Sequence, residues 1–111
     1  MKLNHINLTV TDVEAAAGFL ASYFALKNEG GNKGMALLRD DNGMVITLMK
    51  AKSADYPQTF HIGFIQENEA QVDDLNRRMK ADGLDVTAPE RSHAWTFYVR
   101  APGGFVVEVL A

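Results

Sequence analysis

The chain has 111 residues with 11 Lys and Arg against 14 Asp and Glu, so its formal net charge at pH 7 is −3. Its 47% hydrophobic and 23% charged residues are ordinary for a soluble globular protein of one domain. The basic residues are scattered, which argues against a nucleic-acid partner. The absence of any apolar run of about 18 residues argues against a membrane span, and no signal peptide is visible, so the cytoplasm is the default location.

The first fifty residues predict a strand, a helix and at least two more strands. Residues 3–10 alternate apolar and polar side chains, as a strand with one buried face does. Thr11 and Glu14 have capping-box spacing, so a helix with Thr11 as its N-cap is expected next. Its apolar residues recur every three or four positions and should pack on the apolar face of the first strand. Residues 35–39 and 44–50 follow as strands joined by an Asp-Asp-Asn-Gly turn.

The second half repeats this order. Residues 51–58 have loop composition and are predicted to link a first module, residues 1–50, to a second, residues 59–111. The second module predicts a strand, a helix capped by Asn68 and ended by Gly83, and three more strands. Its predicted strands are residues 59–66, 84–88, 95–100 and 105–110. Each half is therefore expected to fold as βαβββ, although the first half shows no evident counterpart of the second of these strands.

Two sequence matches indicate that the chain is a duplication. Residues 39–49 and residues 100–110 share one pattern, in which Arg precedes a Gly-containing turn and an apolar strand, at an offset of 61 residues. His5 and His61 likewise occupy equivalent places at the start of each module, 56 residues apart. The comparison therefore singles out two histidines at equivalent positions.

Glu108 is the chemically unusual residue of the last strand. It follows a Pro-Gly-Gly turn and lies among Val, Phe and Leu residues that predict a strand covered on both faces. An unpaired ionised Glu would cost several kcal/mol there, so Glu108 needs a partner, and a cation would serve. In the repeat, Glu108 falls on Thr47, so the halves differ at the carboxylate position. Because the chain has no Cys, His and carboxylates are its only strong metal ligands.

These motifs resemble the vicinal oxygen chelate superfamily, which includes glyoxalase I, extradiol dioxygenases, fosfomycin-resistance transferases and bleomycin-resistance proteins. The resemblance covers nearly the whole chain. It rests on Asn4-His5-Ile6, on Phe60-His61-Ile62, and on residues 96–109, which are similar to the family's closing hairpin. It implies an α+β fold with two βαβββ modules in tandem, whose curved mixed sheets carry helices on the outer face.

The resemblance also implies a metal site built from the first and last strands of each module. The matching positions are His5, Thr47, His61 and Glu108. Glyoxalase I fills all four with ligands, whereas extradiol dioxygenases and fosfomycin enzymes use two His and one Glu, the set kept here. The resemblance thus implies one divalent ion, Fe, Mn, Zn, Co or Ni, held by His5, His61 and Glu108 in an enzyme. The ion would keep open positions for a small-molecule substrate with adjacent oxygens, as in a lyase, isomerase, transferase or dioxygenase.

A second function class is a metal-free protein that binds a drug in the same cavity, as bleomycin-resistance proteins do. A single strand His or Glu can also be an ordinary structural residue. Under either function, the candidate substrate-binding residues are Asn7, Thr47, Phe97, Tyr98 and Arg100. His93, which lies near the start of a predicted strand, could point a base into the cavity or simply lie in a loop, and the loop is the favoured interpretation.

The family's habit of pairing modules edge to edge implies a homodimer with two equivalent cavities. An open sheet edge exposes unpaired backbone groups that another module can cover. The modules can pair within one chain or, by exchange, between two chains. Under exchange, His5 would come from a different subunit than His61 and Glu108.

Overall fold

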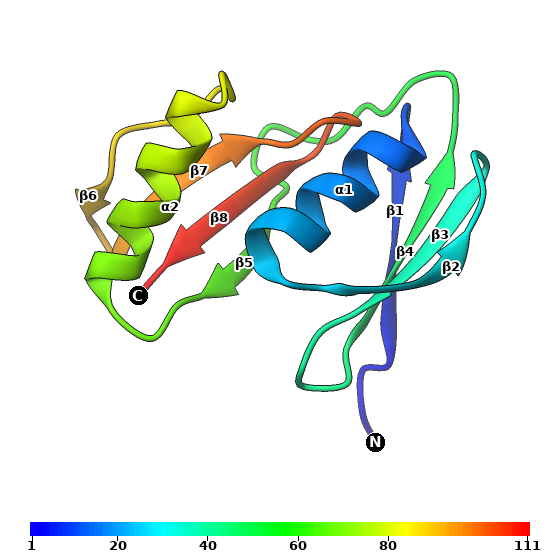
Figure 1. Ribbon diagram of the computed structural model, residues 1–111, viewed down its shortest axis with the longest axis horizontal. Helices are drawn as coiled ribbons and strands as arrows, with labels where there is room; N and C mark the ends of the chain where they lie inside the picture. Colours follow the sequence, from blue (N-terminus) through cyan, green and yellow to red (C-terminus); the bar gives the residue numbers. More distant parts are fainter. The chain divides into compact units, whose positions relative to one another are not determined.

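The computed structural model describes residues 1–111, which divide into two compact units. Unit 1 comprises residues 1–56 and 102–105, and unit 2 comprises residues 57–101 and 106–111. Each unit contains one helix and one four-stranded sheet (Figure 1). Neither helix is long and apolar enough to cross a membrane.

Unit 1 has the predicted βαβββ order. Its elements are β1 (His5–Val10), α1 (Val13–Phe24), β2 (Lys27–Gly31), β3 (Met35–Arg39) and β4 (Val45–Lys50). The sheet order is β1-β4-β3-β2, with β1 parallel to β4 and the other neighbours antiparallel. Strand β2 is the element that the sequence did not reveal. All five of its residues are exposed and none is apolar, so it carries no alternating pattern.

Unit 2 repeats this order. Its elements are β5 (Ile62–Ile65), α2 (Glu69–Ala81), β6 (Glu90–Arg91), β7 (Trp95–Arg100) and β8 (Val106–Leu110). Figure 1 shows β8 between β5 and β7, and the full sheet order is β5-β8-β7-β6. Strand β8 is parallel to β5 and antiparallel to β7. The α+β fold with two βαβββ modules is therefore confirmed.

The strand predicted at residues 84–88 is wrong in its position. That segment pairs with β7 only through an isolated bridge between Val86 and Val99, and the strand β6 lies further on, at Glu90–Arg91. Pro89 separates the two, and because proline has no N–H it cannot continue a hydrogen-bonded ladder.

The strand register agrees with the duplication. In unit 1, Asn7 of β1 lies opposite Thr47 of β4. In unit 2, Gly63 of β5 lies opposite Glu108 of β8. Thr47 and Glu108 therefore occupy the same rung of two equivalent parallel strand pairs, as the sequence comparison predicts.

Helix α1 begins one residue later than predicted. Its N-cap is Asp12, whose carboxylate accepts a hydrogen bond from the Ala15 backbone N–H at 3.0 Å. Thr11 instead donates its backbone N–H to the Gly103 carbonyl at 3.1 Å. Asp is at least as good an N-cap as Thr, so the shift keeps the cap that the helix needs.

Helix α2 has the caps that the sequence predicts. The Asn68 side chain accepts a hydrogen bond from the Gln71 backbone N–H at 3.0 Å. Gly83 follows the last turn with φ of +84°, the left-handed conformation that favours glycine after a helix. Three predicted apolar residues of this helix are buried: Val72, Leu75 and Met79.

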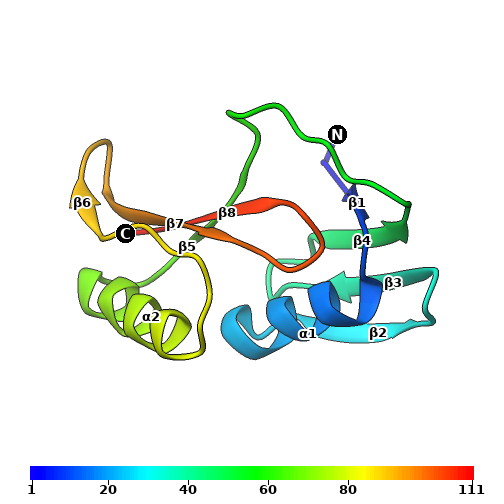
Figure 2. The same ribbon diagram turned by 90° about the horizontal axis from the view of Figure 1, so that it is seen from above.

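Each helix covers one face of the sheet in its own unit. Helix α1 packs against β3 and β4, and Figure 2 shows α2 along one side of its sheet. Phe97 and Val107 of the second sheet are fully buried in the core. Because strand side chains alternate, Tyr98 and Glu108 lie on the other face, which no helix of unit 2 covers. We call this the open face of unit 2.

The turn between β7 and β8 packs within unit 1. Phe105 is fully buried, and its ring meets Phe19 edge to face with centroids 6.5 Å apart. Gly103 has φ of +98°, and a Cβ added there would lie 3.0 Å from Val10 Cβ and 3.3 Å from Ala16 Cβ. The turn therefore needs glycine for both its backbone conformation and its packing.

We expect Gly103→Ala to destabilise the protein by more than its backbone strain alone. Gly43→Ala is the matched control, because Gly43 has φ of +81° with nothing within 4 Å of an added Cβ. In each variant the unfavourable φ should lower the free energy of unfolding by about 1 to 3 kcal/mol. In Gly103→Ala, overpacking should lower it by a further amount of about 1 to 3 kcal/mol. Urea unfolding monitored by circular dichroism measures both. Equal losses would contradict the packing role.

Candidate functional site

The carboxylate of Glu108 is the centre of the open face of unit 2. The residue is only 5% exposed. Its Oε2 accepts a hydrogen bond from Thr96 Oγ1 at 2.7 Å and another from the Tyr98 hydroxyl at 3.2 Å. His93 Nε2 lies 2.6 Å from the same oxygen. Three donors therefore converge on one oxygen of a buried carboxylate.

The strands place two of these donors directly. Tyr98 of β7 lies opposite Glu108 of β8 in the antiparallel ladder. Thr96 is two residues earlier on the same strand, so its side chain points to the same face. His93 lies in the turn between β6 and β7, which closes through a backbone hydrogen bond from Ser92 to Ala94 at 2.9 Å. The turn brings the imidazole back over the carboxylate.

Hydrogen bonding keeps Glu108 ionised. Burial raises the pKa of its carboxyl, but the hydrogen bonds from Thr96, His93 and Tyr98 and the charge of His93 lower it, so the pKa lies below its ordinary value of 4.5. The pKa of the Tyr98 phenol is raised by burial, by the negative charge of Glu108 and by its hydrogen bond to Glu108. At neutral pH the site therefore pairs a carboxylate with a protonated phenol.

The other carboxylate oxygen of Glu108 faces His61. The distance from His61 Nε2 to Oε1 is 3.4 Å. The Nδ1 atom of His61 lies 3.0 Å from the Thr59 carbonyl, which can only accept, so Nδ1 carries the hydrogen. In the neutral ring Nε2 then has a free lone pair, the state in which histidine binds a metal. The His61 ring also meets the Tyr98 ring edge to face, with centroids 5.5 Å apart.

His5 in unit 1 has a similar arrangement. Its Nδ1 lies 3.0 Å from the side-chain oxygen of Asn4, which assigns the hydrogen to Nδ1 and leaves Nε2 as the acceptor. Nearby in the same strand pair, the Thr47 hydroxyl donates to the Asn7 side-chain oxygen at 2.9 Å. Unit 1 thus has a neutral hydroxyl and amide pair on the rung where unit 2 has Glu108.

The structure brings together His61 and Glu108, two of the three predicted metal ligands, in unit 2. His5 belongs to unit 1, and its participation stays a prediction from the sequence. Within neither unit do three His, Asp or Glu side chains already have the arrangement of a metal site. The donors of unit 2 nevertheless suit a divalent ion, because His61 keeps Nε2 free and Glu108 is held as a carboxylate.

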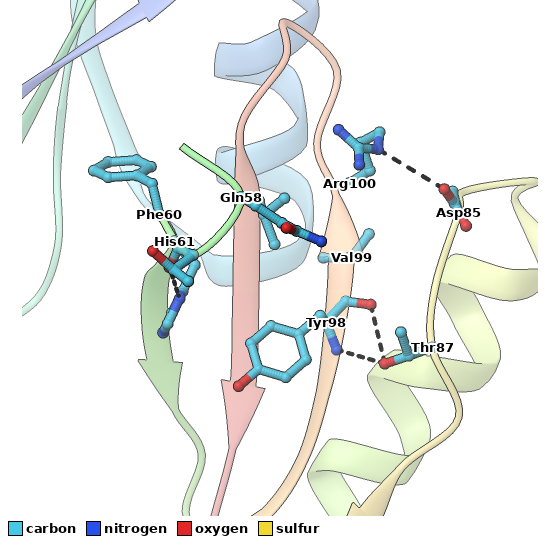
Figure 3. A pocket seen from close by; sticks show the side chains of 10 residues that line it. Gln58, Phe60, His61, Asp85, Thr87, Tyr98, Val99 and Arg100 are labelled. Atoms are coloured by element: carbon cyan, nitrogen blue, oxygen red, sulfur yellow. Dashed lines mark hydrogen bonds and ion pairs between the residues drawn. The ribbon is translucent and has the colours of Figure 1, made fainter. Parts of the chain in front are cut away.

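A pocket of about 440 Å³ opens beside His61 in unit 2 (Figure 3). Tyr98 and Arg100, both predicted to bind substrate, line it together with Thr87. The Arg100 guanidinium Nε is 3.9 Å from Asp85 Oδ2, and both side chains are well exposed. Such a pair contributes little, so Arg100 is free to meet an anion in the pocket.

Phe97 is a correction to the predicted substrate-binding set. Its side chain is fully buried in the core of unit 2. Because it alternates with Tyr98 along β7, it points away from the open face and does not line the pocket.

His93 is the site residue for which the sequence left two interpretations open, a loop residue or a base directed into the cavity, and favoured the loop. It lies in a turn, as predicted, yet its ring contacts Glu108. A turn residue has no periodic signal that indicates its direction. The requirement that a buried Glu108 be surrounded by donors is the signal that favours the cavity.

A family model and a solved structure both match almost the whole chain. The family model described as the Glyoxalase/Bleomycin resistance protein/Dioxygenase superfamily matches residues 2–109. No curated protein matches the chain significantly. A solved structure described as a possible glyoxalase from Bacillus cereus is 51% identical, with a TM-score of 0.95, and the match covers 100% of this chain and 99% of that one.

Two more distant structures share the fold. A genomically encoded fosfomycin resistance protein, FosX, from Listeria monocytogenes, complexed with Mn(II) and sulfate, is 22% identical with a TM-score of 0.84 over 99% of this chain and 89% of that one. A lactoylglutathione lyase from Agrobacterium tumefaciens is 21% identical with a TM-score of 0.75, over 98% and 92% of the two chains. Because the family model matches residues 2–109 and the chain folds as two βαβββ modules, this chain belongs to the glyoxalase/bleomycin resistance protein/dioxygenase superfamily.

Proposed function

We propose that this protein is an enzyme that uses one divalent metal ion to act on a small molecule with two adjacent oxygens. The observation that carries the proposal is the approach of His61 Nε2 to Glu108 Oε1 at 3.4 Å. The remaining polar atoms of both side chains already have partners, so these two atoms are left for a shared cation. His5, with Nε2 also free, is the proposed third ligand.

Two imidazoles and a carboxylate accept Mn, Fe, Co, Ni or Zn, so the ligands do not choose the ion. The FosX structure that shares this fold holds Mn(II), which makes Mn(II) the first ion to test. When bound, the ion would supply a Lewis acid that polarises a substrate oxygen. Glu108 is ready for this role because its lowered pKa means that it need not lose a proton to bind a cation at neutral pH.

The pocket beside His61 would hold the rest of the substrate. Arg100 offers a guanidinium that can orient a carboxylate or phosphoryl-type group, since its pair with Asp85 is long and exposed. The Tyr98 phenol, whose pKa is raised, holds its proton at Oη beside the carboxylate. It can therefore donate a hydrogen bond but is not a base at neutral pH.

The second candidate function is metal-free sequestration of a drug. It is favoured by Met35 and Met49, which lie opposite each other on neighbouring strands of unit 1 and are 42% and 51% exposed. Methionine pairs of this kind adapt to flat apolar ligands. The two functions differ in whether metal binds the chain.

We further propose that the protein is a cytoplasmic homodimer, with each subunit taking one small-molecule substrate. The support is the edge of each sheet: β1 and β2 in unit 1, and β5 and β6 in unit 2, each have only one neighbour. Such edges carry unpaired backbone N–H and C=O groups, which can form hydrogen bonds with a strand of another chain.

The metal proposal predicts saturable binding of one Mn(II) or Co(II) per chain by titration calorimetry. His61→Ala should weaken that binding by at least about tenfold, because a ligand is lost. Glu67→Gln removes an exposed carboxylate of the same unit and should leave the metal affinity unchanged. Added ion should raise the melting temperature of the wild type and of Glu67→Gln equally, and that of His61→Ala by less. If the wild-type protein binds no ion, the metal-dependent function is wrong and drug sequestration becomes the proposed function.

The lowered pKa of Glu108 predicts a specific dependence of stability on pH in metal-free protein. A carboxyl whose pKa is lower in the folded state stabilises the fold above its ordinary value of 4.5, and that stabilisation is lost as the pH falls through the folded-state pKa. Melting temperatures of the wild type should therefore exceed those of Glu108→Gln at pH 7, and the gap should narrow at pH values below 4.5. A gap that stays constant down to pH 3 would contradict this account.

The homodimer predicts a solution mass of twice the 12.2 kDa of one chain. Light scattering after gel filtration at micromolar concentration measures it. A mass of one chain under these conditions would exclude the dimer and leave the metal proposal to be tested in a monomer.

A further inference from the structure

We propose that His93 is a positioning residue that fixes the carboxylate of Glu108 so that Oε1 alone is offered to a metal ion. The inference rests on the proposed function, because it assigns a role to the neighbour of a proposed ligand. All the residues involved belong to unit 2, where the two oxygens of the Glu108 carboxylate have unequal surroundings.

The two oxygens of Glu108 are engaged very differently. Oε2 has three partners within hydrogen-bond distance, at 2.6 Å from His93, 2.7 Å from Thr96 and 3.2 Å from Tyr98. Oε1 faces His61 Nε2 at 3.4 Å. The donors on Oε2 fix the plane of the carboxylate. The lone pairs of Oε1 are therefore left toward His61, the other proposed metal ligand of unit 2.

His93 makes the contact that the strand donors cannot replace. The Thr96 hydroxyl has one hydrogen and lies near two acceptors, Glu108 Oε2 at 2.7 Å and the Val109 carbonyl at 3.2 Å. The Tyr98 hydroxyl is the most distant of the three donors. The terminal torsion of a glutamate is broad, so a carboxylate with fewer donors can rotate and exchange its oxygens. The imidazole of His93 is the closest group that opposes this rotation.

The proton on His93 follows from its partners. A carboxylate only accepts, so Nε2 must carry a hydrogen to bond Glu108. The Ser92 hydroxyl lies 3.4 Å from Nδ1, the ring nitrogen that faces away from Glu108. The His93 side chain is 54% exposed and is anchored through the short turn 92–94. Its removal should therefore leave the core of unit 2 folded.

The test compares wild type, His93→Ala, His93→Gln and Ser92→Ala as metal-free proteins titrated with Mn(II) and Co(II). Partners that orient a metal ligand typically contribute about 10-fold to 100-fold in affinity, so His93→Ala should bind at least about tenfold more weakly. His93→Gln keeps an N–H donor and should recover part of the loss. Ser92→Ala changes the same turn without removing the donor to Glu108 and should bind nearly as the wild type does. The visible absorption spectrum of bound Co(II) should change in His93→Ala and return toward wild type in His93→Gln.

The outcomes separate this proposal from the proposed function. If wild type binds the ion, His61→Ala does not, and His93→Ala matches wild type in affinity and in Co(II) spectrum, the metal function stands and the role of His93 is overturned. Tighter binding by His93→Ala would also overturn it, because His93 would then compete with the metal for Glu108. Wild type that binds neither ion would overturn both proposals.

Discussion

The arrangement of unit 2 depends on one buried charge, the carboxylate of Glu108. Burying it without partners would cost several kcal/mol, and each hydrogen bond to an ionised group returns about 1.5 to 3 kcal/mol. The donors on Oε2 are therefore enough to keep the carboxylate ionised, in agreement with its lowered pKa. The partner that burial requires is thus already present in the chain. Burial alone does not call for a cation, and the case for a metal depends on the free Oε1 facing His61.

The duplication shows how one backbone position can hold two chemistries. In unit 2, Gly63 stands opposite Glu108, and an added Cβ would come into van der Waals contact with Oε1 at 3.9 Å, so glycine leaves this side of the carboxylate without a side chain. In unit 1, Asn7 fills the equivalent place and accepts the hydroxyl hydrogen of Thr47. The first rung is neutral and internally satisfied, whereas the second keeps an ionised oxygen without a close donor. Under the proposed metal-dependent function, this asymmetry favours one ion per chain over two.

Much of the fold was predictable because burial imposes a period on the sequence. The alternation along β1, the apolar run of β8 and the helical spacing of Val72, Leu75 and Met79 gave those elements nearly in place. Strand β2 was not predictable, since all its residues are exposed and only backbone pairing defines it. Of the site, the repeat pointed to His61 and Glu108, which the structure places together. It could not point to His93, whose contact depends on the path of a turn, nor show that Phe97 faces the core.

The fold by itself leaves the reaction open, because one scaffold supports many chemistries and the function resides in the site. The fourth ligand position is therefore informative. A site of the four-ligand kind would need Thr47 as a ligand, but its hydroxyl hydrogen is directed to Asn7, and a neutral hydroxyl is a weak ligand beside a carboxylate. A three-ligand site leaves more positions for substrate oxygens. Selection among substrates would then fall to the pocket, where Arg100 is held only by a long, exposed contact with Asp85. A substrate anion that binds Arg100 in two-point fashion would replace that weak contact at little cost, which favours substrates that combine adjacent oxygens with a negative charge.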